Sequence, residues 1–230
     1  MKKKVVISLP SKGRLREQTL KIFKKKKLDI KFEKGDRDLI GQVTLKKLKI
    51  VCIFQHAREC INALANSTAD IAISGIDLLL NSDLEIQKKI KIYKRLNYGH
   101  APVGIFCINY WIDCQTMLDV SEIASDMLKK NNEPMKCSTK YRRLVENFLD
   151  KKNVKNVEVT ESIGATEVAP RISQSRLVAD IFSTMKTAKA NGLRLIKDGR
   201  VMDSSAALLV SKKSSKIAEV KSLLKLFSKN

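Results

Sequence analysis

Histidine is nearly absent from the sequence, which has only His56 and His100, and its five cysteines include no Cys-x-x-Cys pair. Zinc sites and disulfide frameworks need such residues at close, regular spacings, so neither is predicted. No serine or carboxylate stands at a catalytic-triad spacing from either histidine. We therefore interpret both histidines as structural, with His56 at the start of a helix. Most cysteines lie in apolar runs, where a reduced cysteine packs as a small hydrophobic residue.

Long apolar runs are also absent. No stretch of about 18 apolar residues exists, so no membrane-spanning helix is predicted. The first ten residues have a basic head, but their apolar run is too short for a signal peptide and is more typical of a β-strand. We therefore expect a cytoplasmic protein with no membrane partner.

Aromatic residues make up only 5% of the chain, and 24 acidic residues face 45 lysines and arginines, which gives a formal net charge of +21. A basic balance can indicate a nucleic acid, a membrane surface or an anionic small substrate as partner. The aromatic residues do not alternate with the basic ones, so no platform for stacking bases is predicted. We interpret the charge as a solvated, lysine-rich surface that also attracts polyphosphates, without a nucleic-acid partner.

Short apolar or β-branched runs alternate with helical patterns along the chain, and this alternation predicts an α/β fold with parallel sheets. The expected strands are residues 5–9, 49–54, 70–74, 103–108, 135–138, 157–160, 177–181, 193–196 and 206–210. The expected helices are residues 15–24, 57–65, 117–128, 141–149 and 217–227, with a further helix that begins near Ile76.

The simplest architecture for this pattern is two α/β lobes. We expect residues 1–96 and 192–230 to form a discontinuous lobe I, and residues 97–191 to form lobe II. A turn at Asp198-Gly199, between the last two expected strands, would return the chain to lobe I. Ligands of such sheets bind at the carboxyl ends of strands, so we expect an active-site cleft between the lobes.

The first candidate binding segment is Ser11-Lys12-Gly13-Arg14, which follows a strand and opens a helix. Free amides at a helix start attract anions, and Lys12 and Arg14 add full positive charges. A plain strand–helix turn with a serine cap would look similar, so both interpretations stay open.

The second candidate segment, Asp180-Ile181-Phe182-Ser183-Thr184-Met185-Lys186-Thr187, follows the expected strand 177–181. An acidic residue at a strand end could accept hydrogen bonds from ribose hydroxyls, and the following amides and hydroxyls could hold a 5-phosphate. The alternative is an ordinary aspartate followed by helix-capping residues.

Taken together, these segments resemble ATP phosphoribosyltransferase along nearly the whole chain. The chain ends near the point where long-form members add a histidine-binding domain, so it is similar to the short-form catalytic subunit. The matching strings are Leu9-Pro10-Ser11-Lys12-Gly13-Arg14-Leu15, Ala69-Asp70-Ile71-Ala72-Ile73-Ser74-Gly75-Ile76-Asp77, Tyr98-Gly99-His100-Ala101, Ser138-Thr139-Lys140-Tyr141, Glu161-Ser162-Ile163-Gly164-Ala165-Thr166-Glu167-Val168-Ala169-Pro170, Asp180 to Thr187, and Ala190-Asn191-Gly192-Leu193.

The resemblance implies a periplasmic-binding-protein-like (type II) fold and the first step of histidine biosynthesis. In that reaction a phosphoribosyl group passes from phosphoribosyl pyrophosphate to N1 of ATP, with Mg²⁺ assisting, and pyrophosphate leaves. It also implies a separate regulatory subunit that resembles histidyl-tRNA synthetase, in a hetero-oligomer, or a homodimer when the chain is alone. Since adenine N1 has a lone pair, the reaction needs alignment and charge stabilisation more than a strong base.

The resemblance also assigns binding roles to individual residues. Asp180 would hold the ribose hydroxyls, and Lys12 and Arg14 would meet pyrophosphate or triphosphate oxygens. Asp77 and Glu161 are further candidates for ribose or metal contacts. The 5-phosphate would lie on the loop that contains Ser183, Thr184, Met185, Lys186 and Thr187.

The sequence departs from the family pattern around this loop. Met185 stands where the family has glycine, and a left-handed backbone there would cost about 1 kcal/mol for methionine. Upstream, Ser173-Gln174-Ser175-Arg176 replaces Gly-x-Ala-Asp, and Ala188 replaces leucine. We hypothesise that the loop still binds phosphate, because its helix-start amides remain and Lys186 adds charge. The alternatives are a catalytically impaired or non-enzymatic small-anion-binding relative and, from charge alone, a nucleic-acid binder.

Overall fold

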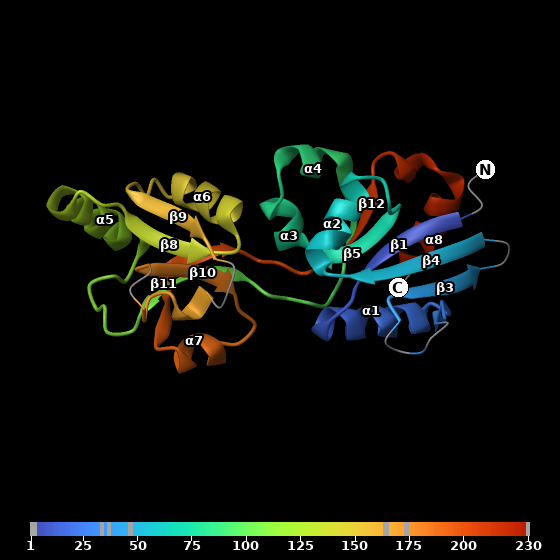
Figure 1. Cartoon of the computed structure of the whole chain (residues 1–230), viewed down its shortest axis with the longest axis horizontal. Coiled ribbons are helices and arrows are strands. Elements are labelled where there is room, and N and C mark those ends of the chain that lie inside the picture. Colours follow the sequence, from blue (N-terminus) through green and yellow to red (C-terminus); the bar gives the residue numbers. More distant parts are fainter. Residues whose placement is uncertain are drawn as a thin grey trace. The chain divides into compact units, whose positions relative to one another are not determined.

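The structure, a computed structural model, describes residues 4–32, 35, 38–45, 48–162, 166–172 and 175–228. The chain divides into two compact units (Figure 1). Unit 1 consists of Met1–Gly99 and Ser205–Asn230, and unit 2 of His100–Ser204. Within the described ranges, no helix is both long and apolar enough to cross a membrane.

Unit 1 is built on a seven-stranded sheet with the order β2-β3-β4-β1-β5-β12-β6. β1 pairs in parallel with β4 and β5, and the other neighbours pair antiparallel. Every residue of β5 and β12 is buried, which explains why both strands are continuously apolar or small. The strands are β1 (Lys4–Pro10), β2 (Lys31–Phe32), β3 (Ile40–Leu45), β4 (Leu48–Gln55), β5 (Ile71–Gly75), β6 (Ile90–Arg95) and β12 (Ala206–Ser211).

The helices of unit 1 bury apolar side chains against this sheet. Phe23 and Phe227 lie 5.4 Å apart, measured between ring centroids, and belong to the cluster that packs on Ile7 and Leu9 of β1. His56 caps the second helix, where its Nδ1 accepts from the Arg58 amide at 3.3 Å, as the sequence predicts. The helices are α1 (Gly13–Lys25), α2 (Ala57–Ala65), α3 (Ile76–Asn81), α4 (Leu84–Lys89), the 3-10 helix η2 (Ser214–Lys216) and α8 (Ala218–Ser228).

Unit 2 contains a five-stranded sheet with the order β11-β7-β10-β8-β9. β8 pairs in parallel with β9 and β10, whereas β7 pairs antiparallel with β10 and β11. The strands are β7 (Val103–Ile108), β8 (Met135–Thr139), β9 (Val157–Glu161), β10 (Leu177–Ile181) and β11 (Leu193–Met202). The helices are α5 (Met117–Asn131), α6 (Arg142–Lys151), the 3-10 helix η1 (Thr166–Val168) and α7 (Lys186–Ala190).

The two faces of the unit 2 sheet are covered by different helices. Figure 1 shows α6 at the top of this unit beside β9, α5 at its left-hand side and α7 below the strands. A cluster on the α7 face joins Phe106 of β7, Val178 of β10 and Leu193 of β11 to Ala188 of α7. Because side chains alternate along a strand, Asp180 points to the same face as Val178. This face therefore positions the acidic residue that the sequence marks.

Every strand and helix expected from apolar patterns is present, but three expectations about the fold are wrong. Both sheets are mixed rather than parallel. In unit 1 three strands that the pattern missed, β2, β3 and β6, and the returning strand β12 run antiparallel to a neighbour. In unit 2, β7 runs antiparallel to both β10 and β11. The chain also stays in unit 2 until Ser204 rather than leaving it at residue 192.

The third error concerns the expected turn at Asp198-Gly199, which lies inside the continuous strand β11. The register shifts between Leu195 and Arg200, so this stretch is a bulge rather than a turn. Gly199 fits there because a Cβ atom would lie 3.1 Å from the Ile105 carbonyl oxygen. Asp198 accepts from the Met117 amide at 2.8 Å, which joins the bulge to the start of α5.

Candidate functional site

The carboxyl ends of the parallel strands of unit 1 meet at one edge of the sheet. Pro10 at the end of β1 pairs with Gln55 at the end of β4. The amide of Ser11 donates to the Gln55 carbonyl at 2.9 Å, so the turn that follows β1 starts from a fixed position. The first candidate segment therefore lies where open α/β sheets bind ligands.

The start of α1 has the properties of an anion site. Lys12 is the N-cap with an extended backbone, and within the described residues its side chain makes no capping hydrogen bond. The first turn has no acidic residue, and Lys12 and Arg14 are both exposed. Because Lys12 rather than Ser11 is the N-cap, the serine-cap interpretation is wrong. The amides and the dipole of this 13-residue helix are left to attract a negative charge.

Asp77 is buried, with 7% of its surface exposed, in the first turn of α3. Its carboxylate lies against the Cα atom of Gly75, where a Cβ atom would collide with it. A negative charge is stabilised at a helix start, so the structure gives Asp77 a local electrostatic role. A contact with ribose or metal stays a prediction for this residue.

The parallel strands of unit 2 also end at one common edge, and Thr139 organises it. The Thr139 hydroxyl donates to the Ala179 carbonyl at 2.7 Å and accepts from the Tyr141 amide at 2.9 Å. The Thr139 carbonyl accepts from the Ser162 amide at 2.9 Å. These bonds fix the ends of β8, β9 and β10 relative to one another.

Asp180 lies at this edge, and its Oδ1 accepts from the Ile181 amide at 2.7 Å. Burial raises the pKa of the Asp180 carboxyl above its usual value, and the negative charge of Glu167 raises it further. The Ile181 amide lowers the same pKa and is second in size only to burial, and the charge of Lys140 and the hydroxyl of Thr166 lower it more weakly than Glu167 raises it. Ionisation of this carboxyl is therefore unfavourable in the free protein. A ligand that donates hydrogen bonds to the carboxylate would make ionisation more favourable.

Thr166 and Glu167 are neighbours of Asp180 that the sequence did not single out as site residues. Both lie on η1, which packs against the end of β10. The string that contains them is one of those that match the family, but a threonine and a glutamate in a loop carry no pattern of their own. Only the folded chain shows that they meet Asp180.

The loop after Asp180 is anchored through Phe182. Its amide donates to the Pro102 carbonyl at 2.9 Å, and its ring meets the ring of Phe106 edge-on, with centroids 5.4 Å apart. Gly104 makes room for this ring, because a Cβ atom at Gly104 would lie 2.7 Å from Phe182 Cε1. The polar loop residues Ser183, Thr184, Lys186 and Thr187 are all exposed.

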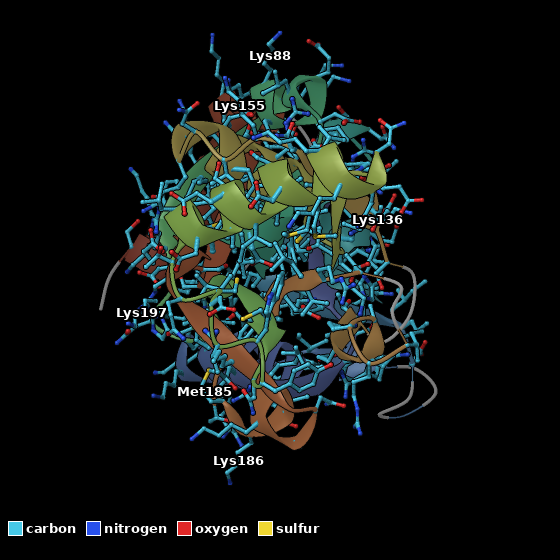
Figure 2. All side chains as sticks on the ribbon, turned by 90° about the vertical axis from the view of Figure 1, so that its left-hand side faces the viewer. Lys88, Lys136, Lys155, Met185, Lys186 and Lys197 are labelled. Atoms are coloured by element: carbon cyan, nitrogen blue, oxygen red, sulfur yellow. The ribbon has the colours of Figure 1, made fainter. Side chains whose placement is uncertain are left out.

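Met185 does not need the left-handed backbone that the family glycine suggests. Its φ of −74° and ψ of 6° are ordinary for a residue at a helix start, and its side chain packs against the cluster around Phe106 and Val178. The predicted cost of a left-handed methionine therefore does not arise. Figure 2 shows Lys186 extending away from the ribbon into open space beside Met185.

Of the other residues around the loop, Ala188 is buried in the same cluster, and its replacement of leucine changes packing rather than polar contacts. Arg176 is exposed, and its amide donates to the Lys136 carbonyl at 3.0 Å. Ser173 and Gln174 lie outside the described residues.

Glu161 does not join Asp180. Glu161 pairs with Thr139, which pairs with Ala179, so these three side chains share one face of the sheet. Asp180, the next residue on β10, points to the opposite face. Glu161 instead lines a groove of about 480 Å³ between β9 and α6, together with Arg142 and Glu146.

The fold of the chain is that of a class of two-lobed binding proteins. The chain is similar to the amino acid ABC transporter substrate-binding protein AbpA of Streptococcus pneumoniae, with a TM-score of 0.52, 13% identity and coverage of 99% of this chain and 88% of that chain. It is also similar to the GluR0 ligand binding core in complex with L-glutamate, with a TM-score of 0.55, 12% identity and coverage of 99% and 91%. The predicted type II periplasmic-binding-protein-like α/β fold is thus confirmed.

The chain is more similar, in structure and in sequence, to ATP phosphoribosyltransferases. The chain matches the ATP phosphoribosyl transferase (HisG:HisZ) complex from Thermotoga maritima with a TM-score of 0.74, at 18% identity over 97% of this chain and 96% of that chain. It is 32% identical over 212 residues to ATP phosphoribosyltransferase of Rhizobium etli (strain CIAT 652), which covers 92% of this chain and 91% of the relative. The relative from Mesorhizobium japonicum is 32% identical, with 91% and 90% covered.

A family model described as HisG, ATP phosphoribosyltransferase, matches residues 56–229. The chain belongs to the ATP phosphoribosyltransferase family. The resemblance read from the sequence is confirmed, and with it the enzyme class, a pentosyltransferase of the first step of histidine biosynthesis.

Proposed function

We propose that this chain transfers the phosphoribosyl group of phosphoribosyl pyrophosphate to N1 of ATP as a short-form catalytic subunit. The observation that carries the proposal is the position of Asp180 at the end of β10, directly before a loop of exposed hydroxyls and amides, in a chain of this family. In the reaction the lone pair of N1 forms a bond to C1 of the ribose, while the bond from C1 to the pyrophosphate oxygen breaks. No proton has to be removed before the attack.

In this proposal Asp180 accepts hydrogen bonds from the ribose hydroxyls. Burial raises the pKa of this carboxyl, and two sugar hydroxyls would stabilise its ionised form by donating to it. Glu167 stands beside it and would repel any other anion from this position. The sugar is thereby oriented with its 5-phosphate toward the following loop.

The 5-phosphate would lie on the loop that contains Ser183, Thr184 and Thr187. α7 has only five residues, so its dipole contributes little. Binding would depend on the hydroxyls and amides of the loop and on the charge of Lys186. The contact between the Phe182 and Phe106 rings would hold the loop backbone in position. Lys12 and Arg14 of unit 1 would meet triphosphate or pyrophosphate oxygens, since these residues flank the open start of α1.

Mg²⁺ is the divalent metal that we propose. Among the described residues no group of three or more His, Cys, Asp or Glu side chains could hold a metal. Mg²⁺ usually binds through substrate phosphates, waters and one or two carboxylates rather than a full protein cage, so this residue set fits a metal that enters with pyrophosphate. When bound, the metal neutralises the leaving pyrophosphate. Glu161 and Asp77 are the carboxylates that the resemblance offers for a direct contact.

We also propose a regulatory partner. The similar Thermotoga structure is a complex of HisG with HisZ, and this chain covers 96% of the matching chain. A HisZ-type subunit, which resembles histidyl-tRNA synthetase, would be the partner in a hetero-oligomer, and the chain alone would be a homodimer. Since both substrates are metabolites of the cytoplasm, the enzyme would work there.

The test is pyrophosphate release from ATP and phosphoribosyl pyrophosphate with Mg²⁺, in the presence and absence of a HisZ-type subunit. Turnover that needs both substrates is expected in at least one condition. No turnover in either condition, from protein shown to be folded by circular dichroism, would contradict the proposal and favour an impaired or anion-binding relative. The unstrained backbone of Met185 supports an active enzyme over that alternative.

A further inference from the structure

One buried hydroxyl of unit 2 lacks a partner. Thr166 begins η1 and is fully buried, and its Oγ1 is the one buried side-chain polar atom in the described part of the chain that makes no hydrogen bond. An unpaired hydroxyl in the protein interior is destabilising, so each such atom calls for an explanation. Valine has nearly the same shape without the polar atom, so packing alone gives no reason for threonine here.

The neighbour of this hydroxyl is Asp180. The Thr166 hydroxyl lies close enough to the Asp180 carboxylate to lower its pKa, although the two groups do not form a hydrogen bond of normal geometry. Among the described residues, the Ile181 amide is the one donor bonded to this carboxylate, and it holds Oδ1. The orientation of the second carboxylate oxygen is therefore open to a further donor.

We propose that Thr166 is a positioning residue of the donor site, whose hydroxyl donates to the Asp180 carboxylate when the ribose of phosphoribosyl pyrophosphate binds. A small rotation of the hydroxyl completes the bond and turns the second oxygen toward the sugar. The charged groups that act on this carboxylate are Glu167 from η1 and Lys140 from the end of β8. Neither fixes its orientation, since Glu167 repels it and Lys140 has a long, flexible side chain. The inference rests on the proposed function and adds a residue to it.

The test compares Thr166→Val with Thr166→Ser. Valine removes the unpaired hydroxyl, so the melting temperature of Thr166→Val is expected to equal or exceed that of the wild type. Its kcat/KM for phosphoribosyl pyrophosphate is expected to fall roughly 10-fold or more, as for the loss of a hydrogen bond to a charged group. Thr166→Ser keeps the hydroxyl and is expected to recover most of the loss.

The pH profile gives a second readout. Without the hydroxyl, the pKa of Asp180 rises, so the acidic limb of the kcat/KM profile is expected to move to higher pH in Thr166→Val. Thr166→Ser is expected to retain the wild-type limb. A threonine with a purely structural role would leave this limb where it is.

Thr160→Val is the matched control. The hydroxyl of Thr160, on β9, already shares a hydrogen bond with the hydroxyl of Ser138, on β8, at 3.2 Å. Removing a paired hydroxyl should lower the melting temperature and leave the donor KM unchanged. Thr160→Val is thus expected to lose stability but not donor binding, whereas Thr166→Val is expected to lose catalytic efficiency but not stability.

Wild-type kinetics in Thr166→Val would overturn the inference while the proposed function stands. A lower melting temperature together with a kinetic loss that serine does not recover would overturn it as well. If the wild type shows no turnover, the proposed function fails, and the thermal shift produced by phosphoribosyl pyrophosphate becomes the measurement. A shift that weakens in Thr166→Val and returns in Thr166→Ser supports the role of Thr166. An equal shift in all three proteins, or none in the wild type, contradicts it.

Discussion

The two candidate anion-binding segments differ in what would hold a phosphate group. In unit 1 the turn before α1 presents exposed cations and the start of a 13-residue helix, so phosphate binding there would be mainly electrostatic. In unit 2 the loop before α7 leads into only five helical residues and is held by the rings of Phe182 and Phe106. Substitutions of charge should therefore matter most in the first segment, and substitutions that move the backbone should matter most in the second.

The largest effect is expected for Asp180→Asn. An amide has one acceptor oxygen in place of two and no negative charge to stabilise the oxocarbenium-like transition state, so kcat/KM should fall by about 100-fold or more. Steady-state kinetics with varied phosphoribosyl pyrophosphate measures this. A loss smaller than that of any loop variant would show that Asp180 is not the residue that holds the ribose.

Asp180→Asn should also change the pH dependence of stability. Because the folded-state pKa of Asp180 is raised, this residue favours the folded state when protonated and destabilises it as pH rises through the folded-state pKa. The asparagine variant lacks this dependence, so it should be at least as stable as the wild type at pH 7. Urea unfolding of both proteins from pH 4 to pH 7 measures the difference, and a variant that loses stability at pH 7 would contradict it.

Gly104→Ala should have the next largest effect, and it acts through the backbone. The new methyl group would lie 2.5 Å from Leu195 Cδ1 and 2.7 Å from Phe182 Cε1, so the ring that anchors the loop must move. Overpacking of this kind costs about 1–3 kcal/mol, and the donor KM should rise with it. Gly192→Ala is a useful contrast, since a Cβ atom there meets nothing within 4 Å but would be strained by a φ of +68°. Of these two variants, only Gly192→Ala is expected to lose stability without a change in donor KM.

The sequence allowed most strands of both sheets to be predicted, because buried strands such as β5, β7 and β12 are short runs of apolar or small residues. It failed where polar residues lie in a strand for reasons of tertiary structure. β11 contains Lys197 and Asp198, and the Asp198 carboxylate binds the start of α5, a contact 81 residues away that no local pattern encodes.

The candidate site shows the same limit. Asp180 and its loop follow a strand and so were visible in the sequence, whereas Thr166 and Glu167 approach Asp180 only because η1 packs against the end of β10. Glu161 was a candidate for ribose or metal contacts because of the resemblance to the family, and no local pattern pointed to it. The strand register places its side chain on the opposite face, and register between distant strands is set by the whole sheet.

A smaller effect is expected for Lys12→Ala or Arg14→Ala in unit 1. Each removes one exposed charge near the start of α1, so kcat/KM for the polyphosphate substrates should fall roughly 3–10-fold at low salt. The loss should shrink as ionic strength rises above about 0.15 M, because exposed charges are screened. Lys21→Ala, in the exposed middle of the same helix, is the control and should change neither value. Losses that do not depend on salt would show that these residues act by contact rather than by charge.

The smallest effect is expected for Met185→Gly, which restores the family residue. If the loop needed a left-handed backbone, glycine would relieve strain and lower the donor KM markedly. Met185 has a φ of −74°, so there is no strain to relieve, and glycine instead removes the contact of the side chain with the cluster around Phe106. The donor KM should stay within about 2-fold of the wild type, while stability falls by about 0.5–1 kcal/mol from the added backbone freedom and somewhat more from the lost packing. A large improvement in donor KM would show that the bound loop takes a different backbone from the free one, and would make the loop of unit 2 a segment that changes shape on binding.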